Sequence, residues 1–238
     1  MEQDISLFDE SASSFAEWVD KLIATGRYRR GECFVEAAQA VVPAQGHILD
    51  YGCGPGRISA MLAGCGFRVL GVDPSSAMIE AAKHQPHQSL DAVFATAATP
   101  PTGDEHGGFD AIVCSSVIEY EAEPDQLLRR FFAALRPAGK LIISFANSQS
   151  FWRALFQRRN MMLGAQRHTW TWPAFRDLLQ RNGFRPIRDA VYYETAFDRF
   201  PPLRFLAGSR FVGPLGLAVA AKEDSLLPRN DSLPTLPS

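Results

Sequence analysis

A glycine cluster preceded by an acid is the part of this sequence best suited to binding a ligand. The segment reads Leu49-Asp50-Tyr51-Gly52-Cys53-Gly54-Pro55-Gly56, and the next apolar segment ends in a second acid, Asp73. Glycine adopts backbone conformations that other residues avoid, and it lets a ligand lie directly against the main chain. An acid about twenty residues beyond such a turn can accept hydrogen bonds from both hydroxyls of a ribose. The spacing therefore predicts a site for a ligand that contains a ribose.

The spacing of the glycines also separates classes of ligand. Dinucleotide-binding turns follow the pattern GxGxxG, in which the third glycine allows close helix packing beside a pyrophosphate. Here the glycines fall as GxGxG, and Arg57 follows the last of them. Asp50 precedes the first glycine by two positions, where a carboxylate repels a pyrophosphate and attracts an ammonium group. The pattern favours a ligand that carries an ammonium group and no phosphate.

Alternating apolar segments surround this turn and predict its scaffold. Strands are expected at 47–50, 67–72, 92–95, 109–114 and 140–145, and helices at 58–63, 76–84 and 124–135. Such alternation indicates strand–helix–strand crossovers and a parallel sheet with both faces covered. Residues 1–45 have apolar residues at helical spacing, and a polar loop is expected at 99–108. Beyond 146 the pattern is weaker, with helices expected at 150–157 and 172–181 and strands at 187–193 and 215–221.

Four motifs within residues 46–146 carry a resemblance to a known family. They are Asp50-x-Gly52-x-Gly54-x-Gly56, Gly71-Val-Asp73-Pro-Ser75, Phe109–Cys114 followed by Val117-Ile-Glu119-Tyr120, and Leu135-Arg-Pro137-Ala-Gly139-Lys140-Leu. In this order and spacing they resemble the class I S-adenosylmethionine (SAM)-dependent methyltransferases. The resemblance implies SAM as the cofactor and an α/β fold with a Rossmann-like, doubly wound, mostly parallel seven-stranded sheet. It also implies one domain over 1–222, made of N-terminal helices (1–45), a SAM-binding core (46–146) and a substrate-side lid (147–214), before a disordered tail (223–238).

The resemblance assigns most cofactor contacts to the glycine-rich turn. Gly52, Cys53, Gly54 and Gly56 would lie under the methionine and ribose parts of SAM. Asp50 would meet the ammonium group of SAM through water.

Other expected contacts lie on the neighbouring segments. Asp73, with Pro74 beside it, would bind the ribose hydroxyls, and Met78 would pack on the adenine, although a core position suits Met78 equally well. Ser115 would lie near the methionine portion of SAM. Arg30 matches an arginine that binds the SAM carboxylate in some relatives, but a solvated helix position explains it as well.

Two positions depart from the family pattern and affect the expected chemistry. Thr96 stands where many relatives carry an acid that binds the adenine amine, so a hydroxyl or main-chain group would serve there. Glu119-Tyr120 replaces a common Glu-His pair, so a histidine base is missing at that point. The best candidate for a general base is His168, and Tyr120 and Glu119 are second candidates. The alternatives are a surface or hydrogen-bonded structural role for His168 and simple packing roles for Tyr120 and Glu119.

Composition excludes several other classes of protein. The 238 residues are 46% apolar and 21% charged, with a formal net charge of −2, so no overall charge points to nucleic acid. The four cysteines lack metal-ligand spacing, and we expect reduced thiols and no metal site. The N-terminus is acidic, unlike a secretory leader, and no apolar run is long enough to span a membrane. These features predict a cytoplasmic protein.

Residues 151–210 hold 11 arginines against four acids, interspersed with aromatic residues. Arginine suits carboxylate or phosphate groups and aromatics suit rings or lipids, although solvated helix faces and core packing also explain them. We expect an aromatic, acidic or partly lipidic small-molecule acceptor, and peripheral membrane contact through 151–159 stays open.

The predicted function is methyl transfer from SAM to a small molecule, most often at oxygen among similar proteins such as the ubiquinone-pathway methyltransferases. The alternatives are a nucleic-acid or protein methyltransferase, a non-catalytic SAM-binding protein, and an NAD-type oxidoreductase, which the glycine spacing disfavours. The sequence does not specify the oligomeric state.

Overall fold

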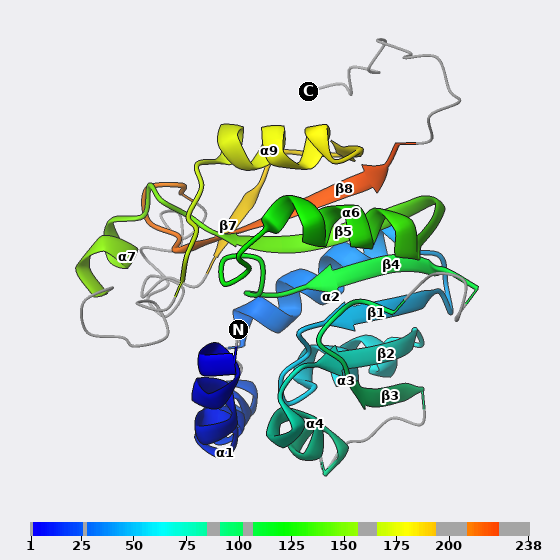
Figure 1. The fold of residues 1–238 in the computed structure, drawn as a ribbon, viewed down its shortest axis with the longest axis vertical. Coiled ribbons are helices and arrows are strands. Elements are labelled where there is room, and N and C mark those ends of the chain that lie inside the picture. The colour runs from blue at the N-terminus through cyan, green and yellow to red at the C-terminus, as the bar shows by residue number, and fades with distance from the viewer. Residues whose placement is uncertain are drawn as a thin grey trace.

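A single eight-stranded sheet forms the centre of the protein in a computed structural model, which describes residues 2–25, 28–84, 91–101, 107–156, 166–193 and 209–223 (Figure 1). The strands are β1 (His47–Tyr51), β2 (Arg68–Asp73), β3 (Ala92–Thr96), β4 (Phe109–Cys114), β5 (Leu135–Ala146), β6 (Phe184–Pro186), β7 (Val191–Tyr193) and β8 (Leu215–Lys222). Their order is β3-β2-β1-β4-β5-β8-β6, and β7 also pairs with β8. Strands β1 to β5 are parallel and β8 is antiparallel to β5, which confirms the mostly parallel sheet.

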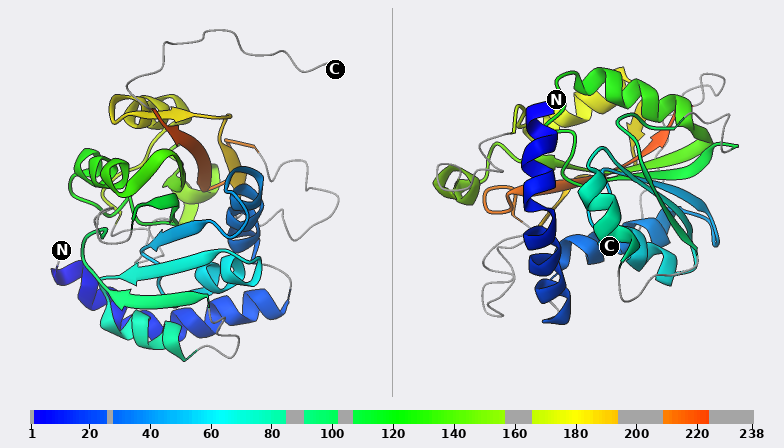
Figure 2. Two further views of the ribbon diagram at one scale, coloured as in Figure 1. Left: turned by 90° about the vertical axis from the view of Figure 1, so that its right-hand side faces the viewer. Right: turned by 60° about the horizontal axis from the view of Figure 1, so that its bottom comes forward.

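Helices cover both faces of the sheet, as Figure 2 shows. The described helices are α1 (Glu2–Ala24), α2 (Arg29–Val41), α3 (Arg57–Gly64), α4 (Ser76–Lys83), α6 (Pro124–Ala134), α7 (Phe151–Phe156) and α9 (Trp172–Arg181). One core packs α2, α3 and α4 against the sheet, and a second packs α6 and α9 against the opposite face. Both faces of the strands are therefore apolar, as a doubly wound fold requires. No helix among the described residues is long and apolar enough to cross a membrane.

The prediction of seven strands is wrong by one. The expected strand at 187–193 is replaced by two short strands, β6 and β7, which both pair with β8. Pro186 ends β6 because its ring nitrogen has no hydrogen to donate to the ladder. Between β6 and β7, the amide of Ile187 donates to the carbonyl of Val219 on β8 at 2.8 Å. The predicted tail falls almost wholly outside the described residues, which end at 223.

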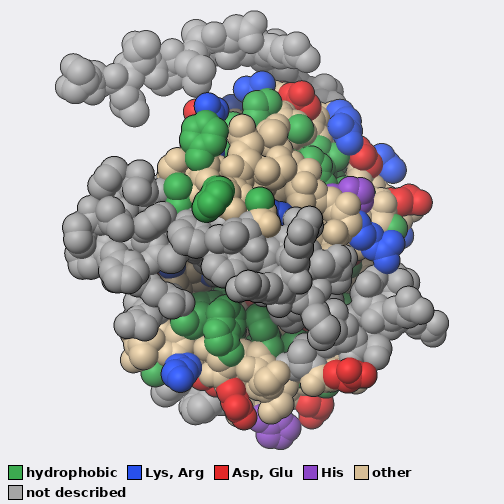
Figure 3. Space-filling model, turned by 90° about the vertical axis from the view of Figure 1, so that its left-hand side faces the viewer, with side chains coloured by type: hydrophobic (Ala, Val, Ile, Leu, Met, Phe, Trp, Pro, Cys, Tyr) green, Lys and Arg blue, Asp and Glu red, His purple; other side chains and the backbone are tan. Residues whose placement is uncertain are grey.

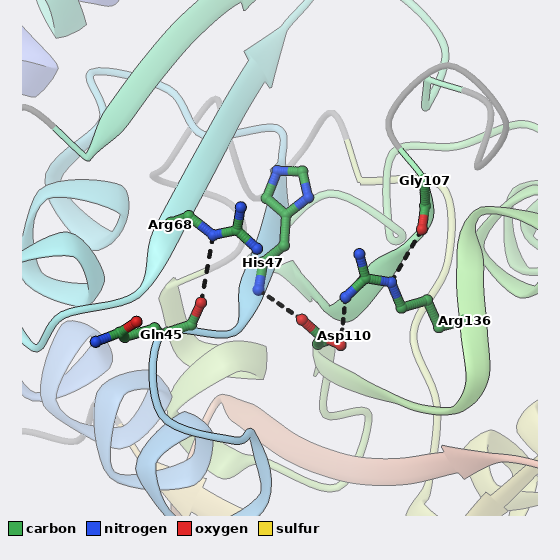
Figure 4. A network of polar contacts seen from close by, with 6 residues as sticks. All are labelled: Gln45, His47, Arg68, Gly107, Asp110 and Arg136. Atoms are coloured by element: carbon green, nitrogen blue, oxygen red, sulfur yellow. Dashed lines mark hydrogen bonds and ion pairs between the residues drawn. The ribbon is translucent and has the colours of Figure 1, made fainter.

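Polar contacts fix the sheet at the amino ends of its strands, opposite the glycine-rich turn (Figure 4). The carboxylate of Asp110 accepts hydrogen bonds from the amide of His47 at 2.7 Å and from the guanidinium of Arg136 at 2.8 Å. The same guanidinium donates to the carbonyl of Gly107 at 2.9 Å. These contacts join β1, β4 and β5 away from the carboxyl edge, where all the predicted ligand-binding residues on these strands and their following loops lie.

Candidate cofactor and acceptor site

The glycine-rich turn follows β1 at the carboxyl edge of the sheet. Gly52, Gly54 and Gly56 have φ angles of 72°, 52° and 73°, a left-handed conformation that favours glycine. The amides of Gly52 and Cys53 donate to the carbonyl of Val72 at 2.8 and 3.0 Å, so the turn is bound to β2. The sequence therefore places three glycines where this backbone requires them.

Two of these glycines serve different purposes. A Cβ atom on Gly52 would lie 2.2 Å from Cγ2 of Val117, so this glycine lets the loop after β4 approach the turn. Within the described part of the chain, a Cβ atom on Gly54 would meet only the sulfur of Met78, at 4.0 Å. Gly54 thus borders open space over bare main chain, next to a buried thioether, and a flat ligand could lie there.

Asp73 connects the glycine-rich turn after β1 with the turn that follows β2. Its side chain is buried, and its two carboxylate oxygens accept hydrogen bonds from the amides of Gly54 and Ser75, both at 2.9 Å. Burial raises the pKa of Asp73, and these two hydrogen bonds oppose the shift. Each oxygen keeps a second lone pair for a ligand hydroxyl. Thr96 pairs with Asp73 in the register of β2 and β3, and it is exposed.

Asp50 has one satisfied and one unsatisfied oxygen. Its Oδ2 accepts a hydrogen bond from the Ser59 hydroxyl at 2.6 Å, and its Oδ1 is buried without a hydrogen-bond partner among the described residues. Burial raises the pKa of Asp50 to about 7. A buried acid of this kind is stabilised as an anion by a nearby cation, and the ammonium group of SAM supplies one. The unsatisfied oxygen, the open space at Gly54 and the free lone pairs of Asp73 all fit SAM.

Helix α1 contacts both the turn after β2 and the residue that follows the glycine-rich turn. The sequence did not predict these contacts. Asp9 accepts a hydrogen bond from the Ser75 hydroxyl at 2.5 Å, beside Asp73. Asp20 forms a two-point ion pair with Arg57, with nitrogen–oxygen distances of 2.5 and 2.6 Å, directly after Gly56. Helical spacing predicted the helix but gave no signal for these long-range contacts.

The three predicted catalytic residues lie close together beyond β4. Glu119 is buried, and its carbonyl accepts hydrogen bonds from the amides of Arg167 and His168 at 2.8 and 3.0 Å. The Gln166 amide donates to the Glu119 carboxylate at 3.3 Å and to the Tyr120 hydroxyl at 3.4 Å. Burial raises the pKa of Glu119 to about 7 and that of Tyr120 to about 12. The imidazole of His168 stacks on Trp170, with ring centroids 5.5 Å apart, and no contact of this ring with Glu119 is recorded among the described residues.

The remaining predicted residues surround the same region. Arg30, on α2, acts electrostatically on both Glu119 and Tyr120, so it lies in their vicinity. Ser115 has a buried hydroxyl without a hydrogen-bond partner among the described residues, as expected for a position that meets a ligand. Cys53 is buried, and burial raises the pKa of its thiol. Pro74 is half-buried between Asp73 and Ser75.

Arg153, like Gln166, belongs to this region and was not singled out from the sequence. Arg153 lies on α7, just after β5, and is 4% exposed. It is one of the 11 arginines of residues 151–210, and nothing in the local sequence separates it from the others.

The carboxyl edge of the sheet faces the viewer in Figure 3. Hydrophobic side chains form groups both above and below the middle of this face, and acidic side chains lie along its lower rim. The expected lid, 147–214, is described only in part, and the suggested membrane-contact segment, 151–159, extends beyond the described residues. Within that segment, Phe151 is 66% exposed.

Sequence comparisons identify relatives of this chain. A family model described as a methyltransferase domain matches residues 16–188. The ubiquinone biosynthesis O-methyltransferase of Coxiella burnetii is 34% identical over 102 residues, which are 42% of this chain and 44% of the relative. The protein of the same name from Bradyrhizobium diazoefficiens is 32% identical over 130 residues, which are 54% of this chain and 51% of the relative. The chain thus spans about half the length of these curated relatives.

Solved structures share the fold at lower identity. A SAM-dependent methyltransferase from Thermotoga maritima superposes with a TM-score of 0.64 at 18% identity, covering 92% of this chain and 99% of the other. A TehB-like SAM-dependent methyltransferase from Corynebacterium glutamicum gives 0.60 at 23% identity, covering 90% and 99%. The family match covers most of the chain, and the glycine-rich turn, Asp50 and Asp73 fit the cofactor. The chain therefore belongs to the methyltransferase domain family, in its class I, SAM-dependent branch.

Proposed function

We propose that the protein transfers a methyl group from SAM to an oxygen atom of a small-molecule acceptor. The observation that carries this proposal is the buried carboxyl group of Glu119, whose pKa is raised to about 7. It lies in the loop after β4, and Val117 of the same loop packs against Gly52 of the turn. The names of the relatives from C. burnetii and B. diazoefficiens, both O-methyltransferases, support the same chemistry.

The cofactor would be held by residues of the two turns. Gly52, Gly54 and Gly56 would support it with bare main chain, and Asp73 would accept hydrogen bonds from its ribose hydroxyls. Met78 would pack on its adenine, and Asp50 would face its ammonium group. When bound, SAM supplies a sulfonium-activated methyl group for in-line displacement by a nucleophile.

Glu119 would supply the base that an oxygen acceptor requires. A hydroxyl attacks the methyl group efficiently only as its proton leaves, and a base whose pKa lies near the working pH removes that proton best. Ionised Glu119 takes the proton, and the Gln166 amide, which donates to both the Glu119 carboxylate and the Tyr120 hydroxyl, holds the carboxyl group in place. Burial of Glu119 also excludes water, which would compete as an acceptor. His168 remains a second candidate for the base.

Replacing Glu119 with glutamine should reduce the rate of methyl transfer by about 10²- to 10⁴-fold at neutral pH. The wild-type rate should rise with pH through about 7, because Glu119 must be ionised to accept a proton, whereas the Glu119→Gln rate should lack that step. The measurement is transfer of labelled methyl from SAM to a panel of phenols and hydroxy acids between pH 5.5 and 8.5.

Glu121→Gln is the matched control, because Glu121 is an acid of the same loop that faces Arg130 and Arg167 electrostatically and has no role in the proposal. It should keep both the rate and the pH profile of the wild type. A Glu119→Gln protein with wild-type rate and profile would exclude Glu119 as the base and leave His168 to be tested. Transfer only to nucleic acid, with a steep loss of activity as salt rises, would contradict a small-molecule acceptor.

A further inference from the structure

Arg153 is a buried cation that the chemistry above leaves without a role. It is 4% exposed, and its Nη1 and Nη2 atoms have no hydrogen-bond partner among the described residues. Together these atoms carry four of the five N–H donors of a guanidinium group. Leaving such donors buried and unpaired is costly, and a native structure that does so needs an explanation.

The structure around Arg153 keeps it in this position. The Ser150 hydroxyl accepts a hydrogen bond from the amide of Arg153 at 3.3 Å and donates to the carbonyl of Val212 at 2.8 Å. Asn147, at the end of β5, donates to the carbonyls of Arg210 and Gly213 at 2.6 and 2.7 Å. The start of α7 is therefore held against residues 210–213, which fixes the main chain from which the Arg153 side chain extends.

Arg153 shares its surroundings with the acid proposed as the base. Burial lowers the pKa of Arg153, and electrostatic interaction with Glu119 and Tyr120 opposes that shift. Arg30 also acts on Glu119, so two arginines face one carboxyl group that is only partly ionised near neutral pH. The local charge is therefore positive.

Unpaired acceptor atoms lie in the same region as these unpaired donors. Oε2 of Glu119 and Oε1 of Gln166 are buried without hydrogen-bond partners among the described residues. A ligand that satisfies both kinds of group carries an anion for the guanidinium and a hydroxyl for the acceptor atoms. A planar carboxylate matches the two-pronged geometry of a guanidinium group best.

We propose that Nη1 and Nη2 of Arg153 bind a carboxylate group of the methyl acceptor. The acceptor is then a hydroxy acid or a carboxylated phenol, held by its carboxylate at Arg153 while its hydroxyl faces Glu119. This inference rests on the proposed function, because it concerns the acceptor of the same site. It makes Arg153 a residue that determines acceptor specificity.

The test compares two probes that differ in one group, a carboxylate in one and a neutral amide of similar shape in the other. The full-length protein, saturated with S-adenosylhomocysteine, is titrated calorimetrically with 3,4-dihydroxybenzoate and with 3,4-dihydroxybenzamide. The wild type should bind the benzoate about tenfold or more tightly than the amide, because a charge-assisted pair replaces a neutral contact. Arg153→Gln should lose this preference while its affinity for S-adenosylhomocysteine stays within about twofold of the wild type.

Two further variants keep the test decisive. Arg153→Lys retains the charge without the two-pronged geometry and should keep only part of the preference for the benzoate. This variant tests the inference even if Arg153→Gln does not fold. Arg176→Gln removes an exposed arginine of the same arginine-rich segment and should bind both probes as the wild type does.

The inference would be overturned if the wild type bound both probes equally or neither of them, or if Arg153→Gln kept the preference for the benzoate. It would also be overturned if Arg153→Gln lost affinity for S-adenosylhomocysteine as strongly as it lost the preference. That last result would assign Arg153 to the carboxylate of the cofactor. Failure of the proposed role of Glu119 is distinguishable, because Glu119→Gln would then keep the wild-type pH profile while the preference for the benzoate stays intact.

Discussion

Replacing Asp73 with alanine is expected to raise the dissociation constant for SAM by roughly 5- to 150-fold, or about 1–3 kcal/mol. The substitution removes the carboxylate proposed to bind the ribose hydroxyls. It also leaves the amides of Gly54 and Ser75 without the acceptors that hold the two turns together. Calorimetric titration of wild type and Asp73→Ala with SAM and S-adenosylhomocysteine measures the change.

Asp110→Ala is a matched control for this experiment. Asp110 also accepts a hydrogen bond from a main-chain amide, that of His47, but it lies at the opposite edge of the sheet. Its replacement should lower the melting temperature and leave the affinity for SAM unchanged. Equal SAM affinity in Asp73→Ala and wild type would rule out the ribose-binding role, whatever the two variants do to stability.

Gly54→Ala should weaken SAM binding by about tenfold or more, comparable to the 1–3 kcal/mol that overpacking typically costs. Its Cβ atom would project into the open space beside Met78, which the proposal fills with cofactor. Because, among the described residues, the sulfur of Met78 at 4.0 Å is the only atom that opposes the added methyl group, the cost to the unliganded protein is that of the left-handed backbone. That cost is about 1–2 kcal/mol.

Gly66→Ala separates this strain from a direct clash with the cofactor. Gly66 has a φ angle of 87°, and a Cβ atom there would meet no atom of the residues that the structure describes within 4 Å. Thermal unfolding should therefore show similar losses for the two variants, whereas only Gly54→Ala should lose SAM affinity. If both variants bound SAM as the wild type does, the cofactor would not lie against Gly54.

Local sequence features predicted much of the fold because they report on short-range geometry. The helix at 172–181 has the expected bounds, since the Thr171 hydroxyl accepts from the amide of Ala174 at its start and Gly183, with a φ of 84°, follows its end. The extra strand was missed because Phe184–Pro186 is too short to show periodicity. Its pairing depends on β8, which lies about thirty residues further along the chain.

The residues of the site likewise fall into those that a local motif predicts and those that depend on contacts distant in the sequence. Gly54 and Asp73 were predicted because each belongs to a compact motif whose spacing reflects a turn after a strand. The contacts of Asp9 with Ser75 and of Asp20 with Arg57 join residues 66 and 37 positions apart, and no local pattern encodes them. Arg153 could not be separated from other arginines, because its burial depends on how α7 packs after β5 rather than on its neighbours in sequence.

The most direct test of the central claim, a SAM site built on the glycine-rich turn, is parallel calorimetric titration of the purified chain with SAM, S-adenosylhomocysteine and NAD. The GxGxG spacing, the buried Asp50 and the free lone pairs of Asp73 predict micromolar binding of the first two ligands and no binding of NAD. Binding of NAD alone, or of none of the three, would contradict the account.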